Sequence, residues 1–277
     1  MKRHASAYAY PYIFWMIVFI IVPLLLVAWY GLFDTEDGKI RFTLEYIQRF
    51  FTTPVYWQVF LRSILLALIS TVICLLIGYP LAYILSGPNV QYKSILLMLI
   101  MLPMWMSFLL RTYAWLTILE KNGILNQILH FFHLPEQNIL YTPAAVILGM
   151  VYNYLPFMII PIYNVLEKMD HRLIEAASDL GASKGRVFRK IVFPLSLPGV
   201  ASGITMTFMP SVTTFIISSL LGGGKINVIG NVIEQQFSKS NDWNFGSALS
   251  LILIIIVLLS MRFMNTKDDD GIGGGII

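Results

Sequence analysis

The chain has 277 residues, of which 57% are hydrophobic and only 12% are charged. Soluble domains carry about 25% charged residues, so this composition, with a mean hydropathy of +0.73, excludes an ordinary soluble protein and indicates an integral membrane protein. The single cysteine, Cys74, excludes a disulfide framework, and the net charge of +4 is better explained by membrane orientation than by nucleic-acid binding.

Six apolar segments are long enough to cross a lipid bilayer, which takes about 20 residues each. The first is predicted to be a retained span, because it is too long for a signal peptide and Leu32-Phe33-Asp34 offers no small-residue cleavage site. We therefore predict an all-α membrane protein with one transmembrane domain covering residues 1–277. Its spans cover about 12–33, 61–85, 95–119, 144–166, 195–221 and 246–264.

The basic residues between the spans predict the orientation of the chain. With the N-terminus inside, the inner segments hold eleven Lys and Arg and the outer loops hold six. Cytoplasmic loops are enriched in basic residues, so both termini and the loop 167–193 are predicted to be cytoplasmic.

The outer loops contain one clear helical signal, a predicted amphipathic helix over Ile124–Phe132 closed by Pro135. His130 and His133 lie three positions apart at the end of this segment and could share a metal ion. No cysteine or further histidine lies nearby in the sequence, so we favour an ordinary loop helix and predict no metal site.

No segment of the chain matches a nucleotide-binding loop. The closest candidates begin at Gly181 and Gly222, but Gly185 is followed by Arg186 and Lys225 by Ile226 where the motif requires Lys and then Ser or Thr. No Ser/His/Asp set or paired carboxylates occur within the spans either. We predict that the chain is not an enzyme, holds no cofactor, and relies on another subunit if ATP drives its action.

Arg111 is an exception among spans that contain almost no charge. A buried membrane arginine costs a few kcal/mol, so it is expected to line a pathway, to pair with a neighbouring subunit, or to extend to the outer interface. Aromatic and amide groups nearby can hold a cation through ring faces, although interfacial belts and helix packing explain them equally well. The candidate pathway residues are Trp105, Arg111, Tyr113, Trp115, Tyr152, Asn153 and Tyr154.

The inner loop after the fourth predicted span carries a spaced motif. Glu175-Ala176-Ala177 is followed after three residues by Gly181, after nine more by Ile191, and then by Phe193-Pro194. This spacing resembles the EAA loop of the inner-membrane components of binding-protein-dependent ABC importers. Phe193 stands where that family usually has leucine. A generic basic loop would explain the charge of this segment but not the spacing.

Longer stretches, such as LPMWMSFLLRTYAW (102–115) and LEKMDHRLIEAASDLGASK (166–184), resemble permease subunits of spermidine/putrescine importers within that family. The resemblance implies the six-helix type I importer permease fold in a bacterial inner membrane. It also implies that the EAA helix docks on a cytoplasmic ATPase dimer that binds ATP and Mg²⁺, and that a second permease, expected to be a paralogue, and an external solute-binding protein complete the transporter. The implied coupling residues are Glu175, Ala176, Ala177, Asp179, Gly181, Ile191 and Pro194.

Polyamines are the solute that this resemblance implies. Related permeases for sulfate, thiamine, iron or phosphonate leave the solute open, and a secondary transporter working alone is a further alternative.

Overall fold

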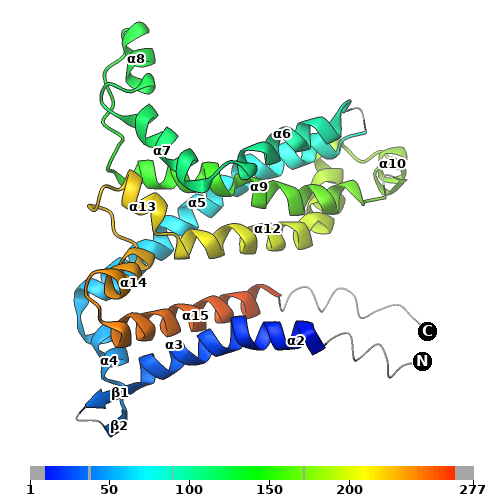
Figure 1. Ribbon diagram of the computed structural model, residues 1–277. Helices are drawn as coiled ribbons and strands as arrows, with labels where there is room; N and C mark the ends of the chain where they lie inside the picture. The colour runs from blue at the N-terminus through cyan, green and yellow to red at the C-terminus, as the bar shows by residue number, and fades with distance from the viewer. Residues whose placement is uncertain (1–9, 37–38, 89, 171, 266–277) are drawn as a thin grey trace, which may run out of the picture. The chain divides into compact units, whose positions relative to one another are not determined.

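The computed structural model describes residues 10–36, 39–88, 90–170 and 172–265, and these residues are mostly helical (Figure 1). The predicted cytoplasmic termini lie outside these ranges. The chain forms two compact units: unit one comprises residues up to 58 together with 232–259, and unit two comprises 59–231 and the residues from 260 onward.

Unit one is built around the first and last apolar helices. A continuous apolar helix covers Pro11–Leu32. A side chain at Gly31 would be crowded, since its Cβ would lie 3.1 Å from the backbone nitrogen of Ala248 and 2.7 Å from Leu251 Cδ1. The elements of this unit are α2 (Tyr10–Met16), the π-helical η1 (Ile17–Ile21), α3 (Val22–Leu32), β1 (Phe33–Glu36), β2 (Lys39–Phe42), α4 (Glu45–Thr52), the start of α5 (Pro54–Ser86), most of α14 (Ile229–Ser238) and most of α15 (Trp243–Asn265).

A polar network joins the hairpin, α4 and the start of α15. The hydroxyl of Tyr46 donates to Asp34 Oδ2 at 3.0 Å, and Asn244 Nδ2 donates to Asp34 Oδ1 and to the Tyr46 oxygen, both at 3.2 Å. Arg49 pairs with Asp242 at 3.1 Å. The bonds of Asn244 and Asp242 join residues about 200 positions apart in sequence, so they fix the start of the last helix to the segment after the first.

This network predicts a loss of stability at high pH. Burial raises the pKa of Tyr46, the hydrogen bond from Asn244 opposes this, and the bond to Asp34 and its charge add to the rise. Because the folded-state pKa lies above the unfolded value of about 10, the contribution of Tyr46 to stability is constant below that pH and is lost as pH rises through the folded-state pKa. Thermal unfolding of detergent-purified protein between pH 8 and 11 measures the effect.

The control variants isolate the Tyr46 hydroxyl. Tyr46→Phe is expected to show a weaker loss of stability above this pH than the wild type, whereas Tyr92→Phe, at an exposed tyrosine, is expected to follow the wild type. Identical pH profiles for wild type and Tyr46→Phe would contradict the prediction.

Unit two has its core where α5, α9 (Pro143–Glu167) and α12 (Phe193–Thr213) pack together. Cys74 from α5 and Met158, Ile159 and Ile162 from α9 are fully shielded from solvent. The helices approach closely because glycines face them: a Cβ at Gly203 would lie 2.9 Å from the sulfur of Met158. Small residues at helix contacts are typical of membrane proteins, where close backbone approach drives packing.

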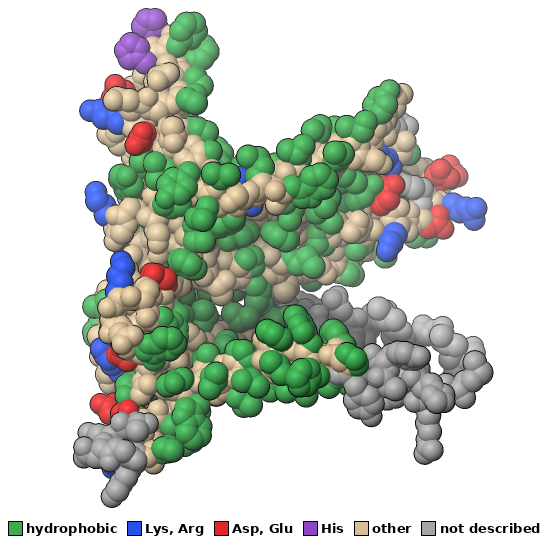
Figure 2. Space-filling view, viewed as in Figure 1, with side chains coloured by type: hydrophobic (Ala, Val, Ile, Leu, Met, Phe, Trp, Pro, Cys, Tyr) green, Lys and Arg blue, Asp and Glu red, His purple; other side chains and the backbone are tan. Residues whose placement is uncertain are grey.

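The remaining elements of unit two are shorter. They are α6 (Lys93–Trp105), α7 (Phe108–Leu119), α8 (Ile124–Phe131), α10 (Arg172–Asp179), α11 (Lys184–Val187), the π-helical η2 (Phe188–Val192) and α13 (Ile216–Leu221). The predicted amphipathic loop helix is confirmed as α8. Figure 2 shows that charged side chains gather at the end of unit two that carries α10.

Asn231 organises the predicted outer loop 222–245. Its Nδ2 donates to the carbonyl of Phe215 at 3.0 Å and to Ser219 Oγ at 2.7 Å, while its Oδ1 accepts from the backbone of Val228 at 3.1 Å. Irregular backbone within protein must be satisfied in this way. The segment between α13 and α14 is therefore a structured connection.

The described residues contain five helices long and apolar enough to span a membrane, and a sixth if one bent pair is counted as a single span. The all-α fold of five to six spans agrees with the prediction. The fifth predicted span, 195–221, is arranged differently, because a continuous helix begins earlier, at Lys184, and ends at Thr213. The separate helix α13 follows it after Thr214 and Phe215.

The third predicted span, 95–119, is divided between α6 and α7, and α6 is bent by 91° from the segment Phe108–Phe131 that follows the break. Pro103 lacks the N–H that would bond to the preceding turn, and Met106 and Ser107 are extended, with ψ of 148° and 130°. Helix α6 therefore ends at Trp105, two residues after Pro103.

Candidate functional site

Helix α10 lies in the loop that carries the spaced motif. The backbone N–H of Arg172 donates to Asp170 Oδ1 at 3.0 Å, which satisfies one free donor at the start of the helix. Glu175 lies in the first turn, where a negative charge is favoured by the helix dipole. At the other end, Gly181 adopts a φ of +77°, and the N–H of Ala182 reaches back to the carbonyl of Ala177 at 3.0 Å. Glycine is favoured here because this left-handed turn disfavours other residues.

One side of α10 packs on the core of unit two and the other side is open. Ile174 and Ala177 lie against the hydrophobic cluster, whereas Glu175, Ala176 and Asp179 are exposed. Leu180, at the end of the helix, is 89% exposed. Within the described residues, the carboxylates of Glu175 and Asp179 form no hydrogen bond or ion pair. The exposed side therefore carries two carboxylates that are not bonded to any other described residue and a leucine that is largely open to solvent.

The spaced motif does not include Leu180. The available signal was its position directly before Gly181 in a polar segment. A leucine there has no membrane to enter and no core to join.

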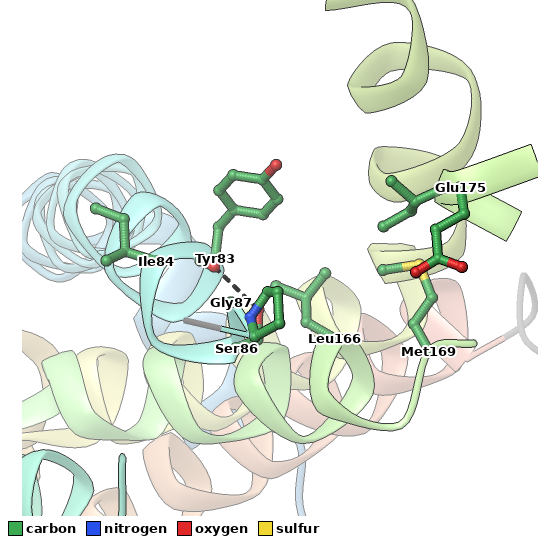
Figure 3. A pocket seen from close by; sticks show the side chains of 9 residues that line it. Tyr83, Ile84, Ser86, Gly87, Leu166, Met169 and Glu175 are labelled. Carbon is green, nitrogen blue, oxygen red and sulfur yellow. Dashed lines mark hydrogen bonds between the residues drawn. The ribbon is translucent and has the colours of Figure 1, made fainter. Parts of the chain in front are cut away.

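A pocket of about 510 Å³ lies between α10 and the ends of α5 and α9. Figure 3 shows Tyr83, Ile84 and Gly87 on one side of it and Met169 and Glu175 on the other. Its other lining residues are Ser86, Pro88, Leu166 and Ile174. Glu175 thus borders both the exposed side of α10 and a cavity that reaches the helix ends.

Lys93 joins the ends of three helices beside this pocket. Its Nζ pairs with Glu167 at 3.1 Å and donates to the carbonyl of Ser86 at 3.4 Å. The start of α6 is thereby held against the ends of α5 and α9.

Ile191 and Pro194 lie where the loop returns into the membrane-spanning helix. Ile191 belongs to η2 and packs on the same hydrophobic cluster as Ile174, while Pro194 is exposed at the second position of α12. Phe193, the departure from the family pattern, lies 5.9 Å from the ring of Tyr79, so the aromatic side chain extends the packing onto α5.

Two aromatic contacts of this region were not predicted. The ring of Phe188 lies edge-on to Tyr83 and Tyr79, at 5.5 and 6.0 Å. They link η2, at the end of the loop, to the end of α5. The sequence signal was the aromatic pair in LIGYPLAYIL, whose positions one turn apart place both rings on one side of a helix.

The structure separates the seven candidate pathway residues into three groups. Arg111, Asn153 and Tyr154 are buried. The ring centres of Trp115 and Tyr152 lie 5.3 Å apart, and the two residues line an apolar pocket of about 560 Å³ with Ile147 and Leu155. Trp105 and Tyr113 are 74% and 52% exposed. The role of all seven residues in a pathway stays a prediction. No three His, Cys, Asp or Glu side chains come together as metal ligands among the residues that the structure describes.

Comparison with known proteins matches almost the whole chain. The sequence model of the "binding-protein-dependent transport system inner membrane component" family matches residues 7–266. The spermidine/putrescine transport system permease protein PotB of Haemophilus influenzae is 41% identical over 251 residues, covering 88% of this chain and 87% of that protein. PotB of Escherichia coli K12 is 38% identical over 265 residues, covering 91% of this chain and 96% of that protein.

Among solved structures, a chain of a bacterial ABC transporter involved in the import of the acidic polysaccharide alginate is similar in fold. The TM-score is 0.81 at 17% sequence identity, covering 98% of this chain and 97% of that chain. At this identity the similarity concerns the fold alone. It covers the residues of both units.

Proposed function

The chain belongs to the family of binding-protein-dependent transport system inner membrane components, and we propose that it is the permease subunit of an ATP-driven polyamine importer. It is a multi-pass inner-membrane protein by that family membership and by its apolar helices. The observation that carries the polyamine assignment is the identity of 38% and 41% to PotB permeases over about nine tenths of the chain.

In this proposal α10 is the coupling helix. A cytoplasmic ATPase dimer, which holds the ATP and Mg²⁺, docks against its exposed side, and both termini of the chain lie on the same side of the membrane. The carboxylate of Glu175, which has no bonded partner among the described residues, the small side chain of Ala176 and the exposed Leu180 support this docking surface, whereas Ala177 packs on the core of unit two. Asp179, Gly181, Ile191 and Pro194 complete the coupling residues.

The chain contributes a mechanical link. Closure of the ATPase dimer displaces α10, and the packing of Ile174, Phe188 and Tyr83 carries that displacement into α5. Helices interrupted by proline, such as α9 with Pro156 and Pro161, can bend as the cavity changes its accessible side. No catalytic residue is needed in this subunit.

The solute crosses between this chain and a second permease, a paralogue, after delivery by an external solute-binding protein. The helices α5, α6, α7 and α12 contain neither Asp nor Glu. Carboxylates that favour a polycation within the membrane would therefore come from the second permease.

A different solute is the second candidate, because the spans lack acidic residues and Arg111 is buried. Both features fit an anion such as sulfate. Uptake of labelled spermidine by cells that express the complete transporter distinguishes a polyamine importer from an importer of another solute. We expect an excess of unlabelled spermidine or putrescine to suppress uptake and sulfate or thiamine to leave it unchanged. Uptake of spermidine that depends on neither the transporter nor ATP would contradict the polyamine assignment.

A further inference from the structure

Arg111 has an unusual environment for a charged residue. Its side chain on α7 is 8% exposed, and its Nε and Nη1 atoms have no hydrogen-bond partner among the described residues. The guanidinium lies 5.8 Å from the centre of the Phe108 ring and interacts electrostatically with the phenol of Tyr154. Neither group carries the negative charge that a buried guanidinium requires, and an uncompensated buried charge costs several kcal/mol.

Unit two contains no carboxylate in its membrane helices that could neutralise Arg111. The helices α5, α6, α7 and α12 contain no acidic residue, and the acidic residue of α9 is Glu167, its last residue. Glu167 pairs with Lys93 at 3.1 Å. The missing charge must therefore come from outside this part of the chain.

The face of α7 that borders the buried side carrying Arg111 is open. Leu110, immediately before it, is 64% exposed, and Tyr113, two positions later, is also exposed. Figure 2 shows hydrophobic side chains over the visible face of α6 and α7. A second membrane protein that covers this face would shield Arg111 completely and could place a side chain against it.

We propose that the second permease subunit supplies an Asp or Glu carboxylate that pairs with Arg111 across the interface between the two permeases. This inference rests on the proposed function for the presence of a second permease. A polyamine cannot be the partner of Arg111, because it has the same sign of charge. A carboxylate accepts two hydrogen bonds from the guanidinium fork, which satisfies donors that the described residues leave free.

A lipid phosphate has similar chemistry but fits the site less well. The two nitrogens without a partner among the described residues are shielded from solvent within the unit, so a partner has to reach past the side chains that cover them. A carboxylate on a flexible side chain can do this, whereas a phosphodiester brings its glycerol and acyl chains with it.

Co-purification of the complete transporter tests the proposal. The tagged chain is expressed with both ATPase and second permease, and the second permease retained per tagged chain is measured in mild detergent. Arg111→Met is expected to lower retention about tenfold or more, because it leaves a buried carboxylate unpaired. The matched control is Arg62→Met on α5, at an exposed arginine, where retention is expected to be unchanged.

The second permease identifies the carboxylate. Each acidic residue of its spans is replaced by its amide in the Arg111→Met background, and one such change is expected to restore retention because neither charge is then left alone. Arg111→Glu combined with arginine at that position is expected to restore uptake. If the Arg111→Met chain does not accumulate in the membrane, its membrane level is measured instead. Recovery of that level when the acidic residue of the second permease is replaced by its amide also supports the ion pair.

Three outcomes would overturn the proposal. The first is normal retention of the second permease by Arg111→Met, and the second is the absence of any restoring position in the second permease. The third is a loss of retention when the wild type is delipidated, provided that phosphatidylglycerol reverses the loss in the wild type but not in Arg111→Met. This third outcome would assign Arg111 to lipid. Restoration by a second-subunit change in a transporter that does not import spermidine would contradict the polyamine assignment and leave the ion pair standing.

Discussion

Replacing Glu175 by lysine is expected to abolish ATP-driven uptake while the chain still folds and reaches the membrane. Within the described residues the carboxylate has no bonded partner, and it is exposed on α10, so the fold does not depend on it. A reversed charge at a docking surface costs several kcal/mol, which corresponds to a loss of about 100-fold or more in assembly with the ATPase. Uptake of labelled spermidine and the amount of ATPase that co-purifies with the chain measure this effect.

Glu136→Lys provides the matched control, because Glu136 is an equally exposed glutamate in the predicted outer loop. It changes the net charge by the same amount and is expected to leave uptake and ATPase binding unchanged. Normal uptake by Glu175→Lys, at a normal membrane level, would refute the role of α10 as the coupling helix.

Gly199→Leu is expected to lower the free energy of unfolding by about 3 kcal/mol, which is at the upper end for overpacking a tight contact. A Cβ at this position of α12 would lie 2.9 Å from the carbonyl oxygen of Pro161 and 3.0 Å from the Cα of Ile162. Both atoms belong to the backbone of α9, so no side-chain rotation relieves the clash and the two helices must separate. Thermal unfolding in detergent measures the loss.

Gly185→Leu separates this steric effect from the intrinsic effect of replacing a helical glycine. Gly185 lies in α11, and a Cβ there would meet no atom within 4 Å. Leucine is a better helix former than glycine, so this variant is expected to be as stable as the wild type or slightly more stable. Equal melting temperatures for the two variants would show that α9 and α12 are not packed as closely as described.

The sequence predicted the features that depend on local composition. Long apolar runs identified the first, second, fourth and last membrane helices to within a few residues, apart from an earlier start of the second at Pro54. The spacing from Glu175 to Pro194 identified the loop that presents α10. These signals are local, because a bilayer selects apolar length and a helix end selects glycine or a capping side chain.

Features that depend on tertiary packing could not be predicted in this way. Pro103 is visible in the sequence, but whether a proline bends a span slightly or divides it depends on the helices around it. The same limit applies to Trp115 and Tyr152. Aromatic residues suit a pathway, an interfacial belt and a helix contact equally well, and only the structure shows that these two contact one another.

The division of the third span has a consequence for the biogenesis of the protein. Helix α6 has 13 residues and α7 has 12, and at 1.5 Å per residue each is about 20 Å long, shorter than the hydrocarbon core of about 30 Å. Neither helix is long enough to be inserted as an independent transmembrane segment during synthesis. We expect α6 and α7 to be retained in the bilayer only once α9 has emerged to pack against them, so the ribosome must translate well beyond this segment before its topology is fixed.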